Sequence, residues 1–167
     1  MNPKHTRYES EIIEFPLVIY DLEKRMVKET LQFFILPTNI EKITPFCTKL
    51  TGFHSQFTPF YIPKKKDLKK GITKEIVEEK GITLQEALNT VECKLEEMED
   101  DFIVVCDGVW DMQFILSLEE KNKSLSLSKH FERFIDIQKV FSFFFPNAKC
   151  HPKQVFQIFS TIFLKFL

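Results

Sequence analysis

The segment from Phe102 to Leu118, with the sequence FIVVCDGVWDMQFILSL, decides the fold of this chain. Its first part, Phe102–Cys106, is a short apolar run between a cluster of acids and the turn pair Asp107–Gly108, which is typical of a central strand. Apolar side chains then recur at helical spacing, so one face of the next helix should be buried on the sheet: Trp110, Phe114, Ile115 and Leu118. The segment predicts a strand, a tight turn and an amphipathic helix in succession.

Asp111 falls in the first turn of this predicted helix, just beyond the carboxyl end of the strand. Open α/β sheets bind their ligands at that position, and a carboxylate there also complements the helix dipole. Asp107 could equally be an N-cap and Asp111 a surface acid that only stabilises the helix start. The spacing of the residues leaves both interpretations open.

The string Asp107–Met112 (DGVWDM) resembles the second motif of the DEDDh 3′-to-5′ exonucleases, in the branch that processes histone messengers and small RNAs. Glu11–Val18 resembles the second strand of that family, and Phe46–Gly52 resembles the short helix and turn after its third strand. Phe134–Lys139 resembles a later segment, so the similarity covers most of residues 11–145 except for one insertion. The resemblance implies an α/β fold: a ribonuclease H-like mixed sheet flanked by helices, here incomplete, in a single domain over residues 1–167.

The resemblance also implies a chemistry. Exonucleases of this family trim RNA ends by hydrolysing the terminal phosphodiester with two divalent ions, usually Mg²⁺. The family pattern holds these ions with an Asp-x-Glu pair on the first strand, the Asp of the Trp-Asp motif, and an Asp that follows a general-base histidine in His-x-x-x-x-Asp. Only the middle element is present here, so Asp111 is the one implied metal ligand and catalytic residue.

Neither missing motif has a good substitute in the sequence. Asp21-Leu22-Glu23 has the Asp-x-Glu spacing, but only one predicted strand separates it from the Phe46 helix where the family has two, which places it in a hairpin turn. The residues five positions after His130 and His151 are Ile135 and Phe156, not acids. The first family strand is missing before Glu11, and the chain stops one helix short of the closing motif. Mg²⁺ needs several converging carboxylates, so we expect no catalysis by this chain alone.

Residues 53–70 interrupt the resemblance and form a predicted insertion or loop. Prolines, aromatic residues and five lysines could stack and neutralise single-stranded RNA, which makes these candidate nucleic-acid contacts: Lys64, Lys65, Lys66, Lys69 and Lys70. The insertion could also be a solvated loop or unspliced sequence. Two alternatives to an exoribonuclease follow: a catalytically inactive module that binds RNA or protein, or a truncated gene product.

Composition adds few constraints. The net charge of −1 gives no global attraction to nucleic acid, so RNA binding would depend on local patches. The four cysteines show no C-x-x-C pair and fit reduced thiols of an intracellular protein, in the cytoplasm or nucleus. The first ten residues are polar, unlike a secretory signal. The apolar stretch 155–167 is shorter than the ~20 residues that span a bilayer, so no membrane anchor is expected.

The remaining elements follow from hydrophobic periodicity. Ile12–Tyr20 is a predicted strand, at an edge or bulged because of Pro16, and Met26–Leu36 is the antiparallel strand that returns after the turn. Predicted helices run from Thr44-Pro45 to a stop at Gly52, from a capping box at Thr83–Glu86 to about Glu97, and over Lys153–Leu167. Residues 129–145 fit a strand or a helix equally well.

Overall fold

The hairpin of β1 (Ile12–Asp21) and β2 (Met26–Ile35) is the framework of this computed structural model. The structure describes residues 11–55, 71–98, 101–147 and 165–166. The two strands pair antiparallel along their length, from Glu14 opposite Phe34 to Asp21 opposite Met26. Apolar side chains from both strands pack on the core, as the sequence pattern predicts.

The turn between β1 and β2 is stabilised by Asp21. Its carboxylate accepts a hydrogen bond from the Lys24 backbone N–H over 2.8 Å and lies 3.7 Å from the Lys24 ammonium group. Arg25 completes the turn in the left-handed region, with a φ of 52°. Asp21 ends β1 and Glu23 is exposed in the turn, so the prediction that this pair belongs to a hairpin turn is confirmed.

Two short strands extend this hairpin into a sheet with the order β3-β2-β1-β6. β3 (Gly81–Ile82) pairs parallel with β2, and β6 (Lys165–Phe166) pairs antiparallel with the start of β1. Pro16 lies past the reach of β6, where that edge of β1 has no strand partner among the described residues, as suits a residue without an N–H. The predicted helix Lys153–Leu167 is wrong at residues 165–166, and its residues 153–164 and 167 lie outside the described residues.

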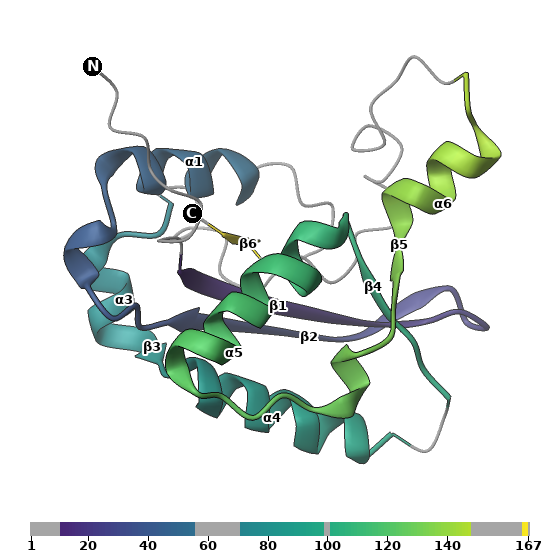
Figure 1. Cartoon of the computed structure of the whole chain (residues 1–167), viewed down its shortest axis with the longest axis horizontal. Coiled ribbons are helices and arrows are strands. Elements are labelled where there is room, and N and C mark those ends of the chain that lie inside the picture. The colour runs from purple at the N-terminus through teal and green to yellow at the C-terminus, as the bar shows by residue number, and fades with distance from the viewer. Residues whose placement is uncertain (1–10, 56–70, 99–100, 148–164, 167) are drawn as a thin grey trace.

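A second sheet contains only β4 (Val104–Cys106) and β5 (Phe134–Asp136), which pair parallel. The strand predicted at Phe102–Cys106 is therefore confirmed for its last three residues. Its predicted central position is wrong within the described part of the chain, because β4 pairs with β5 and not with β1. The predicted fold class, a mixed α/β fold with flanking helices, is confirmed (Figure 1).

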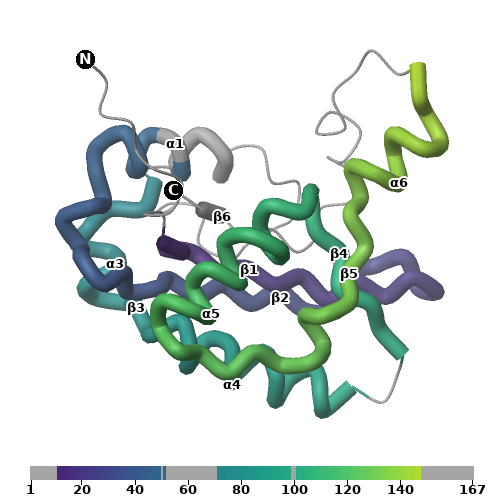
Figure 2. Tube along the Cα trace, in the orientation of Figure 1, coloured from purple at the N-terminus to yellow at the C-terminus, as the bar shows by residue number. Residues whose placement is uncertain are grey.

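The helices occupy these ranges: α1 Pro45–Ser55, α3 Lys74–Lys80, α4 Leu84–Glu96, the π-helix η3 Trp110–Leu116, α5 Ser117–Lys123 and α6 Ile137–Phe144. The Thr83–Glu86 capping box is confirmed at the start of α4. Gly52 does not end α1, so that predicted stop is wrong. Residues 129–145 hold a 3₁₀ turn, β5 and α6 in succession, which explains why no single period fitted them. Figure 2 traces η3 and α5 as one continuous helical path leading away from β4.

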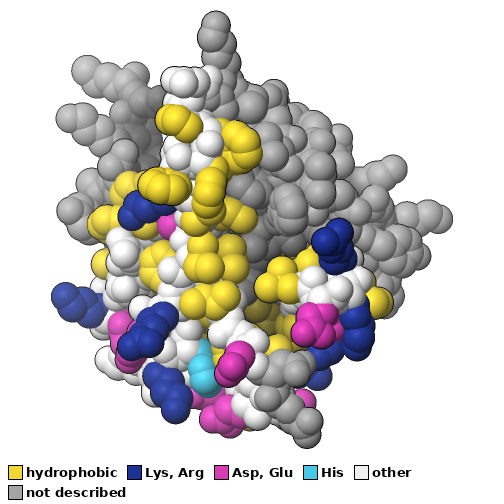
Figure 3. Space-filling model, turned by 90° about the vertical axis from the view of Figure 1, so that its right-hand side faces the viewer, with side chains coloured by type: hydrophobic (Ala, Val, Ile, Leu, Met, Phe, Trp, Pro, Cys, Tyr) yellow, Lys and Arg dark blue, Asp and Glu magenta, His cyan; other side chains and the backbone are white. Residues whose placement is uncertain are grey.

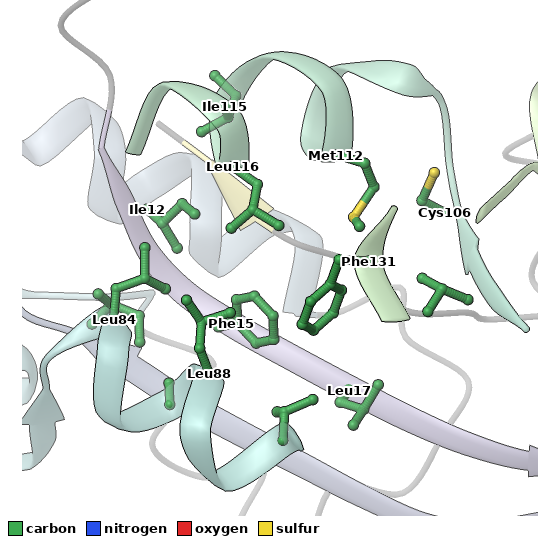
Figure 4. Close-up of a cluster of buried hydrophobic side chains, with 14 of the residues drawn as sticks. Ile12, Phe15, Leu17, Leu84, Leu88, Cys106, Met112, Ile115, Leu116 and Phe131 are labelled. Atoms are coloured by element: carbon green, nitrogen blue, oxygen red, sulfur yellow. The ribbon is translucent and has the colours of Figure 1, made fainter. Parts of the chain in front are cut away.

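The main core is formed by side chains from β1, α4, β4 and η3 around Phe15, which is fully buried. Phe15 meets Phe131 edge to face, with ring centroids 6.3 Å apart. In Figure 4 these two rings lie among Leu88 from α4, Met112 from η3 and Leu17 from β1. Burial of each such side chain contributes about 1.5–3 kcal/mol, so this cluster supplies much of the free energy that holds both sheets together.

A buried ion pair joins the helix after the candidate site to the start of the hairpin. Glu119 of α5 is almost completely buried, and its carboxylate accepts a hydrogen bond from the Ile12 backbone N–H over 2.8 Å. The Lys123 ammonium group lies 2.7 Å from the same carboxylate and 3.1 Å from the Glu11 carboxylate. The charge of Glu119 is therefore compensated, and an edge amide of β1 is satisfied from α5.

Glu11 anchors the other end of this network. Burial alone would raise the pKa of Glu11, but hydrogen bonds from the Thr38 hydroxyl and backbone N–H, with Lys123 and Lys42 nearby, lower that pKa to about 2. The Glu11 carboxylate therefore stays ionised far into the acidic range and keeps its pairing with Lys123.

We expect Lys123→Met to lower the free energy of unfolding by about 3–5 kcal/mol, because it leaves the buried Glu119 carboxylate without a counter-charge. Adding Glu119→Gln should recover part of this loss, since an amide oxygen can still accept from Ile12 and no charge stays buried. Lys24→Met is the matched control: its exposed pair with Asp21 contributes little. Urea unfolding measures all three variants, and a Lys123→Met loss as small as that of the control would contradict the network's importance.

Candidate functional site

Asp111 is presented by a sharp reversal of the chain at the carboxyl end of β4. After Cys106 the chain turns at Asp107-Gly108, where Gly108 has a φ of 102°, a conformation that favours glycine. η3 begins two residues later, so Asp111 lies in its first turn and is partly exposed, as predicted. The carboxylate complements the partial positive charge of the helix start.

Gln138, near the start of α6, holds this turn in place. Its side-chain amide donates to the Asp107 carboxylate over 2.9 Å and to the Asp107 carbonyl oxygen over 3.3 Å. A Cβ atom on Gly108 would lie 3.5 Å from the same amide, so the turn and the side chain are in close contact. The proposal that Asp107 is the N-cap of the following helix is wrong: Val109 occupies that position without a side-chain cap, and Asp107 binds Gln138 instead.

Three carboxylates gather near the Cys106 thiol. Burial, followed by the negative charges of Asp136, Asp111 and Asp107, raises the pKa of Cys106 to about 12. Asp136 was not among the predicted site residues, although it ends β5 and lies opposite Cys106 in the parallel pair of β4 and β5. The signal in the sequence was the position of Asp136, a second acid at the carboxyl end of a short strand. Asp136 caps α6, accepting from the Gln138 and Lys139 backbone N–H groups over 3.0 and 3.3 Å.

Proximity of these acids does not by itself make a metal centre. Within the described ranges, no three His, Cys, Asp or Glu side chains are arranged to hold a metal ion. One oxygen of Asp107 accepts from Gln138, and one oxygen of Asp136 accepts from two backbone amides. The two-ion chemistry of the resembled family needs several converging carboxylates, so Asp111 with these engaged neighbours does not fit that centre.

The predicted burial of Trp110 is wrong. Its side chain is 46% exposed and packs on Phe114, which is 51% exposed, with ring centroids 4.6 Å apart. In the π-helix the hydrogen bonds connect residues five apart, so each turn is wider than the α-helical period assumed for the sequence. Met112, Ile115 and Leu116 therefore face the core, and only Ile115 belongs to the predicted face.

Of the other residues considered for the site, the structure describes His130 but not His151 or the lysines. The His130 ring packs against Phe102, with ring centroids 5.0 Å apart. His151 and the five candidate RNA-binding lysines, Lys64, Lys65, Lys66, Lys69 and Lys70, lie outside the described residues. Of the segment 53–70, only its first three residues are described, as the end of α1. Among the helices that the structure describes, none is long and apolar enough to cross a membrane.

Sequence comparison relates the chain to 3′-to-5′ exonucleases. No protein-family model matches it. It is 26% identical over 149 residues to human and bovine ERI1 exoribonuclease 3, covering 86% of this chain and 37% of those proteins. It is 24% identical over 148 residues to the 3′-5′ exonuclease eri1 of Schizosaccharomyces pombe. The chain thus spans less than half the length of these relatives, with 47% of the Schizosaccharomyces pombe protein covered.

Comparison of structures supports the same fold. The nuclease domain of 3′hExo, a DEDDh family member solved with bound rAMP, superposes with a TM-score of 0.67 at 24% identity, over 88% of this chain and 64% of that one. Cell-death related nuclease 4 gives a TM-score of 0.55 at 21% identity, over 84% of this chain. The arrangement of strands and helices described above is therefore that of a DEDDh nuclease domain over most of this chain.

The raised pKa of Cys106 leads to a labelling prediction. At pH 8 the buried Cys106 should hold roughly 10³ times less thiolate than a thiol with the ordinary value of 9.0, and the thiolate is the reactive form. Iodoacetamide should modify the exposed Cys93 in the folded chain and leave Cys106 unmodified, as read by peptide mass spectrometry. The control is the same reaction in urea, where both cysteines should react. Equal labelling of both in the folded chain would contradict the burial and charge environment described here.

Proposed function

Because this chain is a member of the DEDDh 3′-to-5′ exonuclease superfamily, we propose that it engages RNA 3′ ends at Asp111 but does not hydrolyse them by itself. The carrying observation is that Asp111 lies in the first turn of η3 just after β4, while no three possible metal ligands of the described residues are arranged to hold an ion. The sequence context of Asp111 resembles the family's Trp-Asp motif, and its acidic neighbours Asp107 and Asp136 each accept hydrogen bonds from protein donors. Mg²⁺ would supply the charge that stabilises a departing oxygen, but Asp111 alone does not fit a two-ion centre.

The surface beside Asp111 supports binding to an RNA end. Trp110 and Phe114 present a pair of half-exposed rings next to the Asp111 backbone. Unstacked RNA bases bind on such rings, which distinguishes recognition of single-stranded ends from recognition of a duplex. Among the known proteins similar to this chain, a 3′-exonuclease has been solved in 3′-end specific recognition of a histone mRNA stem-loop. RNA is accordingly the partner that we propose.

A trimming assay tests the catalytic half of this proposal. We expect the purified chain with Mg²⁺ to shorten a 5′-labelled RNA no faster than its Asp111→Asn variant, because Asp111 is the one family carboxylate that we match to a residue of this sequence. Gel electrophoresis over a time course gives both rates. Trimming that Asp111→Asn abolishes would show that other acids replace the missing ones and would make the chain an active exoribonuclease.

A binding assay tests the RNA half. If the lysines of the predicted insertion contact phosphates, RNA affinity should fall steeply with salt, and the slope should decrease when Lys64, Lys65, Lys66, Lys69 and Lys70 are changed together to Ala. Trp110→Ala should weaken binding by ~1–3 kcal/mol without changing that slope, since stacking releases no counterions. Fluorescence anisotropy of a labelled RNA measures both quantities. An unchanged affinity and slope in the five-lysine variant would eliminate the insertion as an RNA contact.

A further inference from the structure

The ring pair of Trp110 and Phe114 lies at a helix start that has no side-chain cap. Trp110 is 46% exposed and Phe114 51%, so burial in the core fixes neither ring. Trp110 is the first residue of η3, and the N-cap residue Val109 makes no side-chain hydrogen bond to that helix. A helix start without such a cap is less stable than a capped one. The position of the rings therefore depends on what holds the turn before them.

The turn at Asp107-Gly108 is held by a local donor and by a distant one. The Cys106 thiol donates to the Gly108 carbonyl oxygen over 3.0 Å, between residues two apart in the chain. The Gln138 amide donates to the carboxylate of Asp107 over 2.9 Å and to its carbonyl oxygen over 3.3 Å, across 31 residues. We call these two hydrogen bonds the Gln138–Asp107 contact. Of the two donors, Gln138 is the one that ties the turn to another helix.

Gln138 is itself fixed relative to β4. Its backbone N–H donates to the Asp136 carboxylate over 3.0 Å, at the capped start of α6. Asp136 ends β5 and lies opposite Cys106 in the parallel pair of β4 and β5. The path from β4 through the turn to Gln138, and back through β5, is therefore closed by hydrogen bonds. Such a network restricts the turn more than an isolated hydrogen bond would.

The surroundings of the Gln138–Asp107 contact strengthen it. Both side chains are partly buried. Figure 3 looks onto the side of the molecule that carries β5 and α6 and shows hydrophobic side chains gathered in a band there. A hydrogen bond from an amide to a carboxylate is charge-assisted, and it is stronger where burial reduces competition from water. The contact can therefore set where the turn lies, and with it the ring of Trp110 two residues after Gly108.

We propose that Gln138 is a positioning residue for RNA: it holds the turn so that the rings of Trp110 and Phe114 stay aligned for a base of the RNA end. This inference rests on the RNA binding proposed above and adds a residue from α6 to it. A preorganised ring pair loses less conformational freedom when a base stacks on it, so it binds more tightly than rings on a mobile turn. Glu119 of α5 holds the far end of the same helical segment, so loosening of the turn acts on its start.

The fluorescence of Trp110 tests the positioning without RNA, because it is the only tryptophan of the chain. Gln138→Met keeps an unbranched side chain of similar size and removes its hydrogen-bond donor. We expect this variant to raise the acrylamide quenching constant of Trp110, because the ring loses its fixed place beside Phe114. Its affinity for a labelled RNA, measured by fluorescence anisotropy, should fall about tenfold, a loss comparable to that of a stacked base.

Gln85→Met is the matched control. Gln85 likewise bridges distant segments, because it accepts from the Ser126 backbone N–H over 2.9 Å and donates to the Ser126 carbonyl oxygen over 3.3 Å. This bridge lies beyond the end of α5, at the opposite end of the helical segment from Trp110. The control should therefore keep the quenching constant and the RNA affinity of the original chain. Circular dichroism confirms that each variant is folded.

An exchange of donor and acceptor separates positioning from a general loss of stability. Gln138→Glu sets two carboxylates against each other and should weaken RNA binding at least as much as Gln138→Met. Adding Asp107→Asn supplies an amide at position 107 that donates to the new carboxylate, so the double variant should recover most of the affinity. Asp107→Asn alone keeps an acceptor for Gln138 and gives the reference affinity for the double variant.

Three outcomes would overturn the role of Gln138 alone: Gln138→Met has the Trp110 quenching of the original chain, its RNA affinity matches that of Gln85→Met, or the exchanged pair binds as weakly as Gln138→Glu. Failure of the proposed RNA binding gives a different result. If Trp110→Ala binds RNA as tightly as the original chain, the rings do not bind the RNA end, and the role of Gln138 is overturned with them, even where Gln138→Met raises the quenching constant.

Discussion

The buried carboxylate of Glu119 is the constraint on which the arrangement of the two sheets depends. It bonds the first amide of β1 and pairs with Lys123, so α5 cannot shift without exposing a charge to the core or leaving an edge amide unsatisfied. Because α5 continues η3 directly, the same contact fixes where η3 begins and therefore where Asp111 lies. A structural ion pair at one end of a helical segment thus sets the position of the candidate site at the other end.

Much of the fold follows from local patterns in the sequence. The hairpin turn was predictable from Asp21 and the polar residues after it, and α4 from its capping box, because both depend on hydrogen bonds within a few residues. The division into two sheets was not, since it depends on pairing between distant strands. The face of η3 was also mispredicted: periodicity assumes α-helical turns, and the π-helical hydrogen bonds over Trp110–Leu116 shift every side chain around the axis.

In the candidate site, too, only the features that depend on local sequence could be predicted. Asp111 was placed correctly, because a strand followed by a glycine turn and a helix start is a local pattern. Asp136 was missed and Asp107 was given the wrong partner, because both depend on β5 and α6 returning beside β4 from thirty residues later in the chain. Gln138 links these segments, and nothing in its immediate sequence distinguishes it from a surface glutamine.

The hydrogen bonds to its carboxylates distinguish this site from a two-ion metal centre. In such a centre, carboxylates that would repel one another are held together by the metal charge. Here protein groups offset part of the negative charge. Gln138 donates to Asp107, and the first backbone amides of α6 donate to Asp136. The positive end of η3 complements Asp111. One oxygen of Asp107 and one of Asp136 already accept these hydrogen bonds, so each offers a divalent ion only its second oxygen without rearrangement. Burial, together with the negative charges of Asp136, Asp111 and Asp107, raises the pKa of the Cys106 thiol and keeps it protonated. The RNA binding that we propose needs only the rings of Trp110 and Phe114, because base stacking does not require the metal.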